Sequence, residues 1–114
     1  LALPHPQARY ASITTILTTI DELPELVASH LSSLIPTFLK MVKSNDKLNK
    51  SEVRLVSLNC LEALTRCIEL TKLVPYQERI LKELSPVLDD KKRKVRKAAV
   101  DARQAYFELG RSVD

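Results

Sequence analysis

One helical pattern occurs three times along the chain, and its spacing limits the possible folds more than any other feature. Each copy begins with an apolar residue followed by arginine: Ala8-Arg9, Val53-Arg54 and Val95-Arg96. The three arginines therefore lie 45 and then 42 residues apart. A period of about 40–47 residues is typical of proteins in which pairs of antiparallel helices stack along a line. The sequence accordingly predicts an all-α chain of stacked helix pairs.

The last copy has contact residues on two faces of the same helix. A narrow, alanine-rich stripe at helical spacing consists of Val95, Ala98, Ala99, Ala102, Tyr106 and Leu109. A second stripe, about 100° further around the helix, consists of Arg96, Val100, Arg103 and Phe107. Because a lone helical hairpin buries only one face of each helix, two contact faces indicate a repeat that packs on two sides.

The second stripe of the middle copy carries Leu58 and Leu61. In an internal repeat such a stripe packs against the next repeat, so we expect both leucines to be buried. We expect no further helix pair to follow the final repeat. We expect Val100 and Phe107 to stay available to a partner there, unless the tail at 110–114 folds back over them.

This period resembles that of HEAT and armadillo repeats, and we predict an α-α superhelix (a solenoid) of about two and a half repeats. The expected divisions are an incomplete first repeat at 1–23 with its inner helix at 8–20, a second repeat at 24–72, and a last repeat with its tail at 73–114. The single glycine argues against an all-β fold of 114 residues. The longest apolar runs are far shorter than the roughly 18 residues of a membrane span. We expect a section of a longer array, since solenoid units contact only their neighbours.

Prolines and polar runs mark the expected helix boundaries in the first part of the chain. We expect a helix from Pro24 to about Val42, in which Pro36 causes a kink or an interruption because its ring removes a hydrogen bond. A polar loop follows at 44–50, and the next helix occupies about 52–69.

The rest of the chain is predicted to contain a linker, an outer helix and the last inner helix. The linker lies at 71–75 and the outer helix at 76–88. Asp89 and Asp90 are expected to cap the last helix. By analogy with HEAT units, one of these aspartates is also expected to pair with Arg96, which would give this arginine a structural role.

Basic residues fill six of the seven positions from 91 to 97, in a chain whose net charge is only +4. Apart from Arg96, this basic cluster consists of Lys91, Lys92, Arg93, Lys94 and Lys97. Such a run is able to bind phosphates or acidic proteins and resembles a nuclear import signal, although a solvated turn also explains it. Aromatic residues make up only 4% of the chain and no nucleic-acid reader motif is present, so we expect no direct nucleic-acid binding.

The sequence lacks the motifs and residue clusters of enzymes and metal sites. Cys60 and Cys67 lie on one helix face about 10.5 Å apart along its axis, which is too far for a disulfide, and we expect both in the core. His5 and His30 have no cysteine or carboxylate at ligand spacing. With one glycine, a phosphate-binding loop is not expected. We therefore predict a protein that is not an enzyme and has no cofactor or metal.

Three segments are similar to one known family of helical-repeat proteins. They are VRLVSLNCLEALTR at 53–66, LVPYQERIL at 73–81 and PVLDDKKRKVRKAAVDARQAYFELG at 86–110. These segments resemble the C-terminal end of the Mms-nineteen type adaptors, HEAT-repeat proteins of cytosolic iron–sulfur protein assembly that are also linked to nucleotide excision repair. The resemblance covers most of the chain and fades before about Leu31.

The resemblance implies a non-enzymatic adaptor located in the cytoplasm and the nucleus. Members of this family connect a targeting complex, made of a WD-repeat propeller and a small scaffold subunit, to client apoproteins such as DNA helicases and polymerases. On this chain we expect partners to contact Arg93, Arg96, Val100, Arg103, Tyr106 and Phe107. Two alternatives remain open, namely a HEAT-type scaffold for another acidic protein and a basic helical array that binds nucleic acid.

Overall fold

The computed structural model describes residues 4–109, and every regular element in that range is helical. In chain order the elements are α1 (Pro6–Glu22), α2 (Pro24–Ala28), α3 (Leu31–Met41), α4 (Ser51–Cys67), α5 (Leu70–Leu84), the 3-10 helix η1 (Ser85–Asp89) and α6 (Arg93–Phe107). The predicted all-α fold is confirmed. None of these helices has the length and apolar character needed to cross a membrane.

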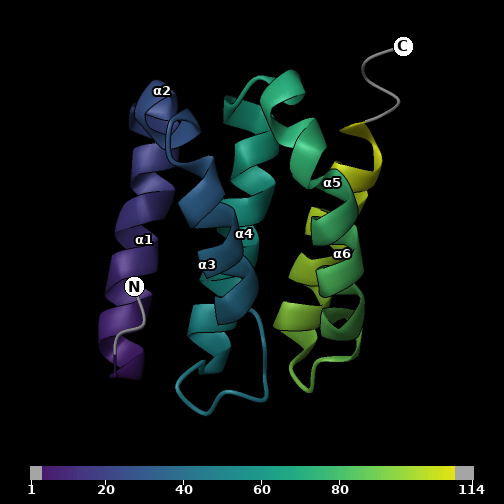
Figure 1. Ribbon diagram of the computed structural model, residues 1–114. Helices are drawn as coiled ribbons and strands as arrows, with labels where there is room; N and C mark the ends of the chain where they lie inside the picture. Colours follow the sequence, from purple (N-terminus) through teal and green to yellow (C-terminus); the bar gives the residue numbers. More distant parts are fainter. Residues whose placement is uncertain (1–3, 110–114) are drawn as a thin grey trace.

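The helices form two layers (Figure 1). Helices α1, α4 and α6 lie side by side in the inner layer, with α4 in the middle, and they run in the same direction. Helices α3 and α5 run the opposite way in the outer layer, where α3 covers α4 and α5 covers α6. Each outer helix thus forms an antiparallel pair with the inner helix that follows it, and the pairs stack along a line as the repeat period predicted.

The stripes of the inner helices account for much of the core. Val95, Ala99, Ala102, Tyr106 and Leu109, from the alanine-rich stripe of α6, are all buried. Val53 of α4, the counterpart of Val95, is buried as well, and so are Leu58 and Leu61 on the second stripe of α4. Because alanine side chains are small, they allow α6 to pack closely against its neighbours.

The predicted outer helix at 24–42 is interrupted at Ser29 and His30 rather than at Pro36. Ser29 Oγ donates a hydrogen bond to the carbonyl of Leu26 (2.7 Å), and Nδ1 of His30 lies 3.0 Å from the same oxygen. These local bonds compete with the helical hydrogen bonds and end α2. Pro36 stays inside α3, where its missing N–H removes only the bond to Ser32, an exposed residue in the first turn of that helix.

The prediction of a linker at 71–75 was wrong, because α5 begins at Leu70 and this segment is helical. Only Ile68 and Glu69 separate α4 from α5. Pro75 lies inside α5 and removes the hydrogen bond to the carbonyl of Thr71, an exposed residue of the first helical turn. Because Thr71 is exposed, its carbonyl is able to accept a hydrogen bond from solvent instead, and the helix continues through the proline.

Candidate partner-binding surface

Arg9, near the start of α1, reaches the loop between α3 and α4. Its Nη1 atom donates hydrogen bonds to Oδ1 of Asn49 (2.7 Å) and to Oδ2 of Asp46 (3.1 Å). Arg9 and Asn49 are both buried, and the Asn49 amide donates in turn to the backbone carbonyls of Lys40 and Lys43. These contacts tie α1 to the turn of the next helix pair.

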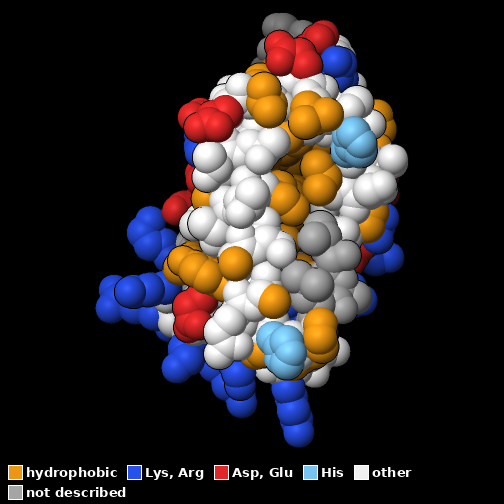
Figure 2. All heavy atoms as spheres, turned by 90° about the vertical axis from the view of Figure 1, so that its left-hand side faces the viewer, with side chains coloured by type: hydrophobic (Ala, Val, Ile, Leu, Met, Phe, Trp, Pro, Cys, Tyr) orange, Lys and Arg blue, Asp and Glu red, His pale blue; other side chains and the backbone are white. Residues whose placement is uncertain are grey.

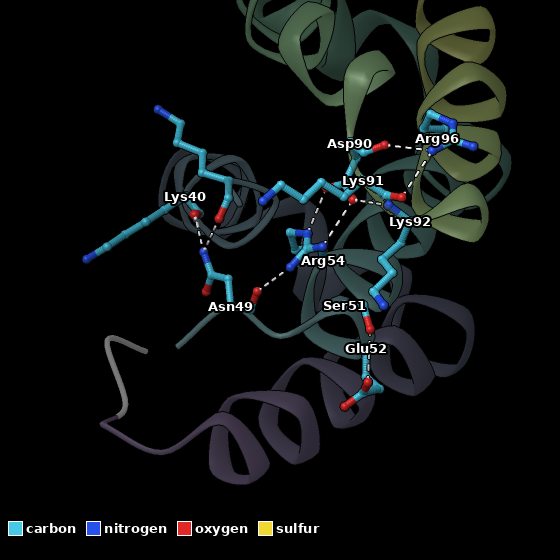
Figure 3. A network of polar contacts seen from close by, with 10 residues as sticks. Lys40, Asn49, Ser51, Glu52, Arg54, Asp90, Lys91, Lys92 and Arg96 are labelled. Atoms are coloured by element: carbon cyan, nitrogen blue, oxygen red, sulfur yellow. Dashed lines mark hydrogen bonds and ion pairs between the residues drawn. The ribbon is translucent and has the colours of Figure 1, made fainter. Parts of the chain in front are cut away.

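Arg54 repeats this arrangement one helix pair further along (Figure 3). Its Nε donates to Oδ2 of Asp90 (2.8 Å) and its Nη2 donates to Oδ1 (3.0 Å), which is the bidentate geometry of arginine and a carboxylate. Its Nη1 donates to the backbone carbonyl of Asn49 (2.6 Å). Because both charged side chains are buried, salt screens this ion pair less than it screens surface pairs.

Asp46 and Asp90 make the same local hydrogen bond. In each of them Oδ1 accepts a hydrogen bond of 2.9 Å from the backbone N–H two residues later, at Leu48 and Lys92 respectively. Burial raises the pKa of Asp90, but the hydrogen bonds from Arg54 and the Lys92 N–H outweigh it, so the pKa of this carboxyl lies below its usual value. Asp90 is therefore ionised at neutral pH.

Arg96 occupies the third equivalent position, but it does not bind the side chain of Asp89 or Asp90 as predicted. Its Nη1 donates to the backbone carbonyls of Asp90 (2.9 Å) and Lys91 (3.2 Å). The prediction was wrong because it paired the aspartate with the arginine of the same repeat, whereas Asp90 binds Arg54 of the preceding inner helix. The predicted capping of α6 is also wrong, since its N-cap position makes no side-chain hydrogen bond.

Sequence reasoning missed most of this polar network, which includes Arg9, Asp46, Asn49 and Arg54. A signal for it was present, because arginine recurs at each inner helix and an aspartate precedes each of the last two inner helices. Spacing along one chain does not show which arginine an aspartate will reach. That depends on how the helix pairs stack, because each arginine lies 36 or 37 residues before the aspartate that it binds.

Two apolar residues on the second stripe of α6, Val100 and Phe107, are exposed, although the residues equivalent to Val100 in the other inner helices are buried. Ile13 in α1 and Leu58 in α4 are 1% and 0% exposed, whereas Val100 at the same position of α6 is 55% exposed. Phe107, further along this stripe, is 48% exposed. Among the described elements, none lies on that side of α6 (Figure 1). Helix α6 therefore exposes apolar side chains on the face that α1 and α4 use to pack against the next inner helix.

Arg103 lies between Val100 and Phe107 on this stripe and is half-buried. Its Nε atom is buried and has no hydrogen-bond partner within residues 4–109. Buried donors are nearly always satisfied in folded proteins. Arg103 thus retains hydrogen-bonding capacity that the described part of the chain does not use.

Tyr106, which we expected among the partner-contacting residues, is instead fully buried in the core. Its hydroxyl donates a hydrogen bond of 2.5 Å to the carbonyl of Leu61 in α4, and its own carbonyl accepts one of 2.9 Å from Gln77 in α5. Burial, with a smaller contribution from nearby Cys60, raises the pKa of this phenol. Tyr106 therefore joins three helices, and a partner cannot reach its side chain.

The basic cluster forms part of a larger basic end of the molecule. All five of its members are exposed, and so are Lys40, Lys43, Lys47 and Lys50, which lie in or beside the loop at the same end. Figure 2 shows most of the visible Lys and Arg side chains projecting from this lower end. Within the cluster, Lys97 pairs with Asp101 at 3.2 Å, which is a weak surface contact. The fold thus adds a second run of lysines to the one in the sequence.

The cysteines and the other titratable side chains of residues 4–109 do not form a cluster that could hold a metal ion. Cys60 is buried and burial raises its pKa to about 12, which makes it unreactive, while Cys67 is half-buried. No group of three or more His, Cys, Asp or Glu side chains gathers at ligand distance in this range. A groove of about 460 Å³ lies between residues 42–45, which follow α3, and the end of α5 with η1. Its two carboxylates, Glu83 and Asp90, are engaged in ion pairs.

The amino-acid sequence of the chain matches one family of known proteins. Residues 1–65 match the family model described as the C-terminal region of an RNAPII transcription regulator. The chain is 39% identical over 110 residues to the MMS19 DNA repair/transcription protein of Saccharomyces cerevisiae. It is 34% identical to the MMS19 nucleotide excision repair protein homologs of Mus musculus and Homo sapiens. These alignments cover 96% of the chain but only 10–11% of each relative, so the chain spans about a tenth of their length.

Proposed function

Since the chain belongs to the MMS19 family of DNA repair and transcription proteins, we propose that it is a non-enzymatic scaffold for protein–protein interaction. In this proposal it is a docking section of the adaptor that links the cytosolic iron–sulfur targeting complex to client apoproteins of DNA repair and replication. Its direct partners are the small scaffold subunit and the WD-repeat propeller of that complex. The adaptor acts in both the cytoplasm and the nucleus.

The exposed second stripe of α6 is the observation that carries this proposal. Val100 and Phe107 are large apolar side chains that lie next to half-buried Arg103. Apolar and arginine residues grouped on one face are typical of protein-binding hot spots. Leu58, the counterpart of Val100 in α4, is buried in the layer where α4 contacts α6, which supports a helical partner for the same position of α6.

The charge of the surrounding surface favours an acidic partner. Arg93 and Lys97 are exposed on the first turns of α6, and Lys91, Lys92 and Lys94 extend the positive surface to the adjoining turn. Complementary charge accelerates association and orients the partner, although rim charges add little to affinity. The apolar stripe would supply most of the binding energy and the basic residues would set the orientation.

Substitution of one exposed valine tests the proposal. Val100→Asp is expected to weaken binding to the purified complex of scaffold subunit and propeller at least tenfold, because it places a charge in the buried part of the interface. Val74→Asp is the matched control, since Val74 is exposed at 41% on α5 in the outer layer. Both variants should keep the wild-type circular dichroism and melting temperature.

Two results would contradict the proposal. Normal binding by the Val100→Asp variant would exclude the stripe as the contact, and equal losses from both variants would show a nonspecific effect of the added charge. If the wild-type chain bound neither subunit, the proposed partner would be wrong, and a helical scaffold for a different acidic protein or a nucleic-acid-binding array would remain. Calorimetry with purified components separates these cases.

The basic end supports one alternative function, which is nucleic-acid binding. The structure brings Lys43, Lys47 and Lys50 to the same end as Lys91 and Lys92. Affinity for duplex DNA that falls steeply with salt, and that is lost on neutralising these lysines, would favour this alternative. A mobility-shift assay with duplex DNA at physiological salt shows whether the chain binds nucleic acid.

A further inference from the structure

Arg54 and Arg96 are anchored to their own turns by the same atom. Nη1 of Arg54 donates to the carbonyl of Asn49 at 2.6 Å, and Nη1 of Arg96 donates to the carbonyls of Asp90 and Lys91 at 2.9 and 3.2 Å. The guanidinium group is a rigid planar fork, so use of Nη1 leaves the edge formed by Nε and Nη2 for another acceptor. Each arginine thus uses Nη1 to bind its own turn, and in each the edge formed by Nε and Nη2 remains for a second acceptor.

This second edge is occupied in Arg54 and unoccupied in Arg96. In Arg54, Nε and Nη2 hold both carboxylate oxygens of Asp90. In Arg96, no acceptor from residues 4–109 bonds to either atom, and neither atom is among the buried groups that lack a partner. Arg96 is half-buried, so this edge lies at the surface beside the second stripe of α6.

Arg54 shows which group suits such an edge, because its Nε and Nη2 atoms hold a carboxylate. Arg9 also binds an aspartate, although through its Nη1 atom. Arg9 binds Asp46 and Arg54 binds Asp90, and each aspartate belongs to the turn before the next inner helix. Each carboxylate is held in place by the backbone N–H two residues later. In both turns the carboxylate also reaches the arginine of the preceding inner helix, through Oδ2 in Asp46 and through both oxygen atoms in Asp90.

We propose that the partner of α6 places an aspartate or glutamate on the Nε–Nη2 edge of Arg96, from an acidic turn that precedes a helix. The helix itself packs on Val100 and Phe107, as α6 packs beside Leu58 of α4. This inference rests on the proposed function, because it specifies the chemistry of the partner at that same surface. The partner thus continues the stack and completes the third arginine–carboxylate contact.

A protein carboxylate fits this surface better than a nucleic-acid phosphate. Val100 and Phe107 follow Arg96 on the same stripe and are both about half exposed. A helix from a protein partner would bury these apolar side chains, whereas a charged phosphate backbone would leave them in water. Arg93 and Lys97, on either side of Arg96 in the sequence, add positive charge that attracts an acidic turn.

Arg96→Lys tests the inference with the complex of scaffold subunit and propeller as the probe. Lysine keeps the positive charge and can still donate to the turn carbonyls, but it cannot form the second, bidentate contact. We expect the dissociation constant to rise at least tenfold, because lysine keeps the charge but loses the bidentate, charge-assisted hydrogen bonds to the carboxylate. Arg93→Lys is the matched control and should change the dissociation constant less than twofold.

A charge-swap experiment then identifies the carboxylate. Arg96→Asp should abolish binding, and one Asp→Arg or Glu→Arg substitution in an acidic turn of the partner should restore it. Unfolding curves of each variant of the chain show whether a loss of binding reflects a loss of folding.

The outcomes separate this inference from the proposed function. If wild type binds the complex and Arg96→Lys binds within twofold of wild type, the arginine–carboxylate contact is excluded while the docking function stands. If wild type does not bind at all, the proposed function fails, and this inference fails with it. If Arg96→Lys weakens binding to duplex DNA and leaves the protein complex unaffected, a phosphate rather than a carboxylate is the ligand, and the inference is overturned.

Discussion

The ion pair between Arg54 and Asp90 joins two helix pairs through side chains that are both buried. Burying two charges costs hydration energy, so such a pair adds little stability compared with a well-packed apolar replacement. Loss of one partner is different, because the other charge then stays buried without compensation. The pair therefore specifies how consecutive helix pairs align, and it makes folding sensitive to either residue.

Asp90→Asn is expected to lower the free energy of unfolding by roughly 3–5 kcal/mol, since Arg54 keeps its buried charge without a carboxylate. Asp89→Asn is a matched control at the neighbouring exposed position and should change the free energy by less than about 0.5 kcal/mol. Urea denaturation at neutral pH measures both. Similar effects from the two substitutions would contradict the role given to Asp90.

Stability should also depend on pH through Asp90. Its pKa in the folded state lies below the reference value of 3.8, so the unfolded state binds more protons than the folded state in the acidic range. The stabilisation is complete above about pH 5 and is lost as the pH falls through the folded-state pKa. Asp46 and Glu83, whose pKa values are also lowered by hydrogen bonds, act in the same direction.

Wild type should therefore lose more free energy of unfolding than Asp90→Asn between neutral pH and about pH 3. Urea titrations at a series of pH values measure this difference. Parallel pH profiles for the two proteins would show that Asp90 has the same pKa in both states, contrary to the structure.

Tyr106→Phe removes the hydroxyl that donates to Leu61 and is expected to lower the free energy of unfolding by about 1 kcal/mol. Tyr10→Phe, at an exposed position of α1, should have no measurable effect. Neither substitution should change partner binding, because Tyr106 lies in the core. If Tyr106→Phe weakened partner binding without lowering stability, Tyr106 would have to contact the partner, contrary to its position in the core.

At the level of the helix, the same stripe has different roles in α4 and α6. Leu58 is buried between helices, whereas Val100 at the equivalent position is exposed. Leu58→Ala is expected to cost about 2–5 kcal/mol of unfolding free energy because it leaves a cavity. Val100→Ala should cost less than about 0.5 kcal/mol in the absence of a partner. Thermal unfolding of both variants checks the difference, and comparable losses would mean that the chain itself covers Val100.

Sequence periodicity was sufficient to predict the helical faces but not all their ends and contacts. The stripes of α4 and α6 follow from the regular spacing of apolar residues, because a helix has a fixed number of residues per turn. Helix ends depend on local competition for hydrogen bonds, so Ser29 and His30 end α2 while Pro36 and Pro75 are tolerated. The pairing of Arg54 with Asp90 depends on the stacking of two helices, which spacing alone does not encode.

At the level of the whole molecule, the stack has an exposed apolar surface at each edge. At one edge Val100 and Phe107 lie on α6. At the other, Tyr10, Leu23 and Leu26 are exposed on or beside α1 and α2, and Figure 2 shows apolar side chains on that face. The α6 edge adjoins the basic cluster and has the unoccupied edge of Arg96, so it suits an acidic protein.

Amide hydrogen exchange of the chain, measured with and without the complex of scaffold subunit and propeller, tests this central claim most directly. Binding at the α6 edge should slow exchange in the turn at 90–92 and along α6, and leave α1 and α2 unchanged. Slower exchange confined to α1 and α2, with no change in α6, would contradict the account.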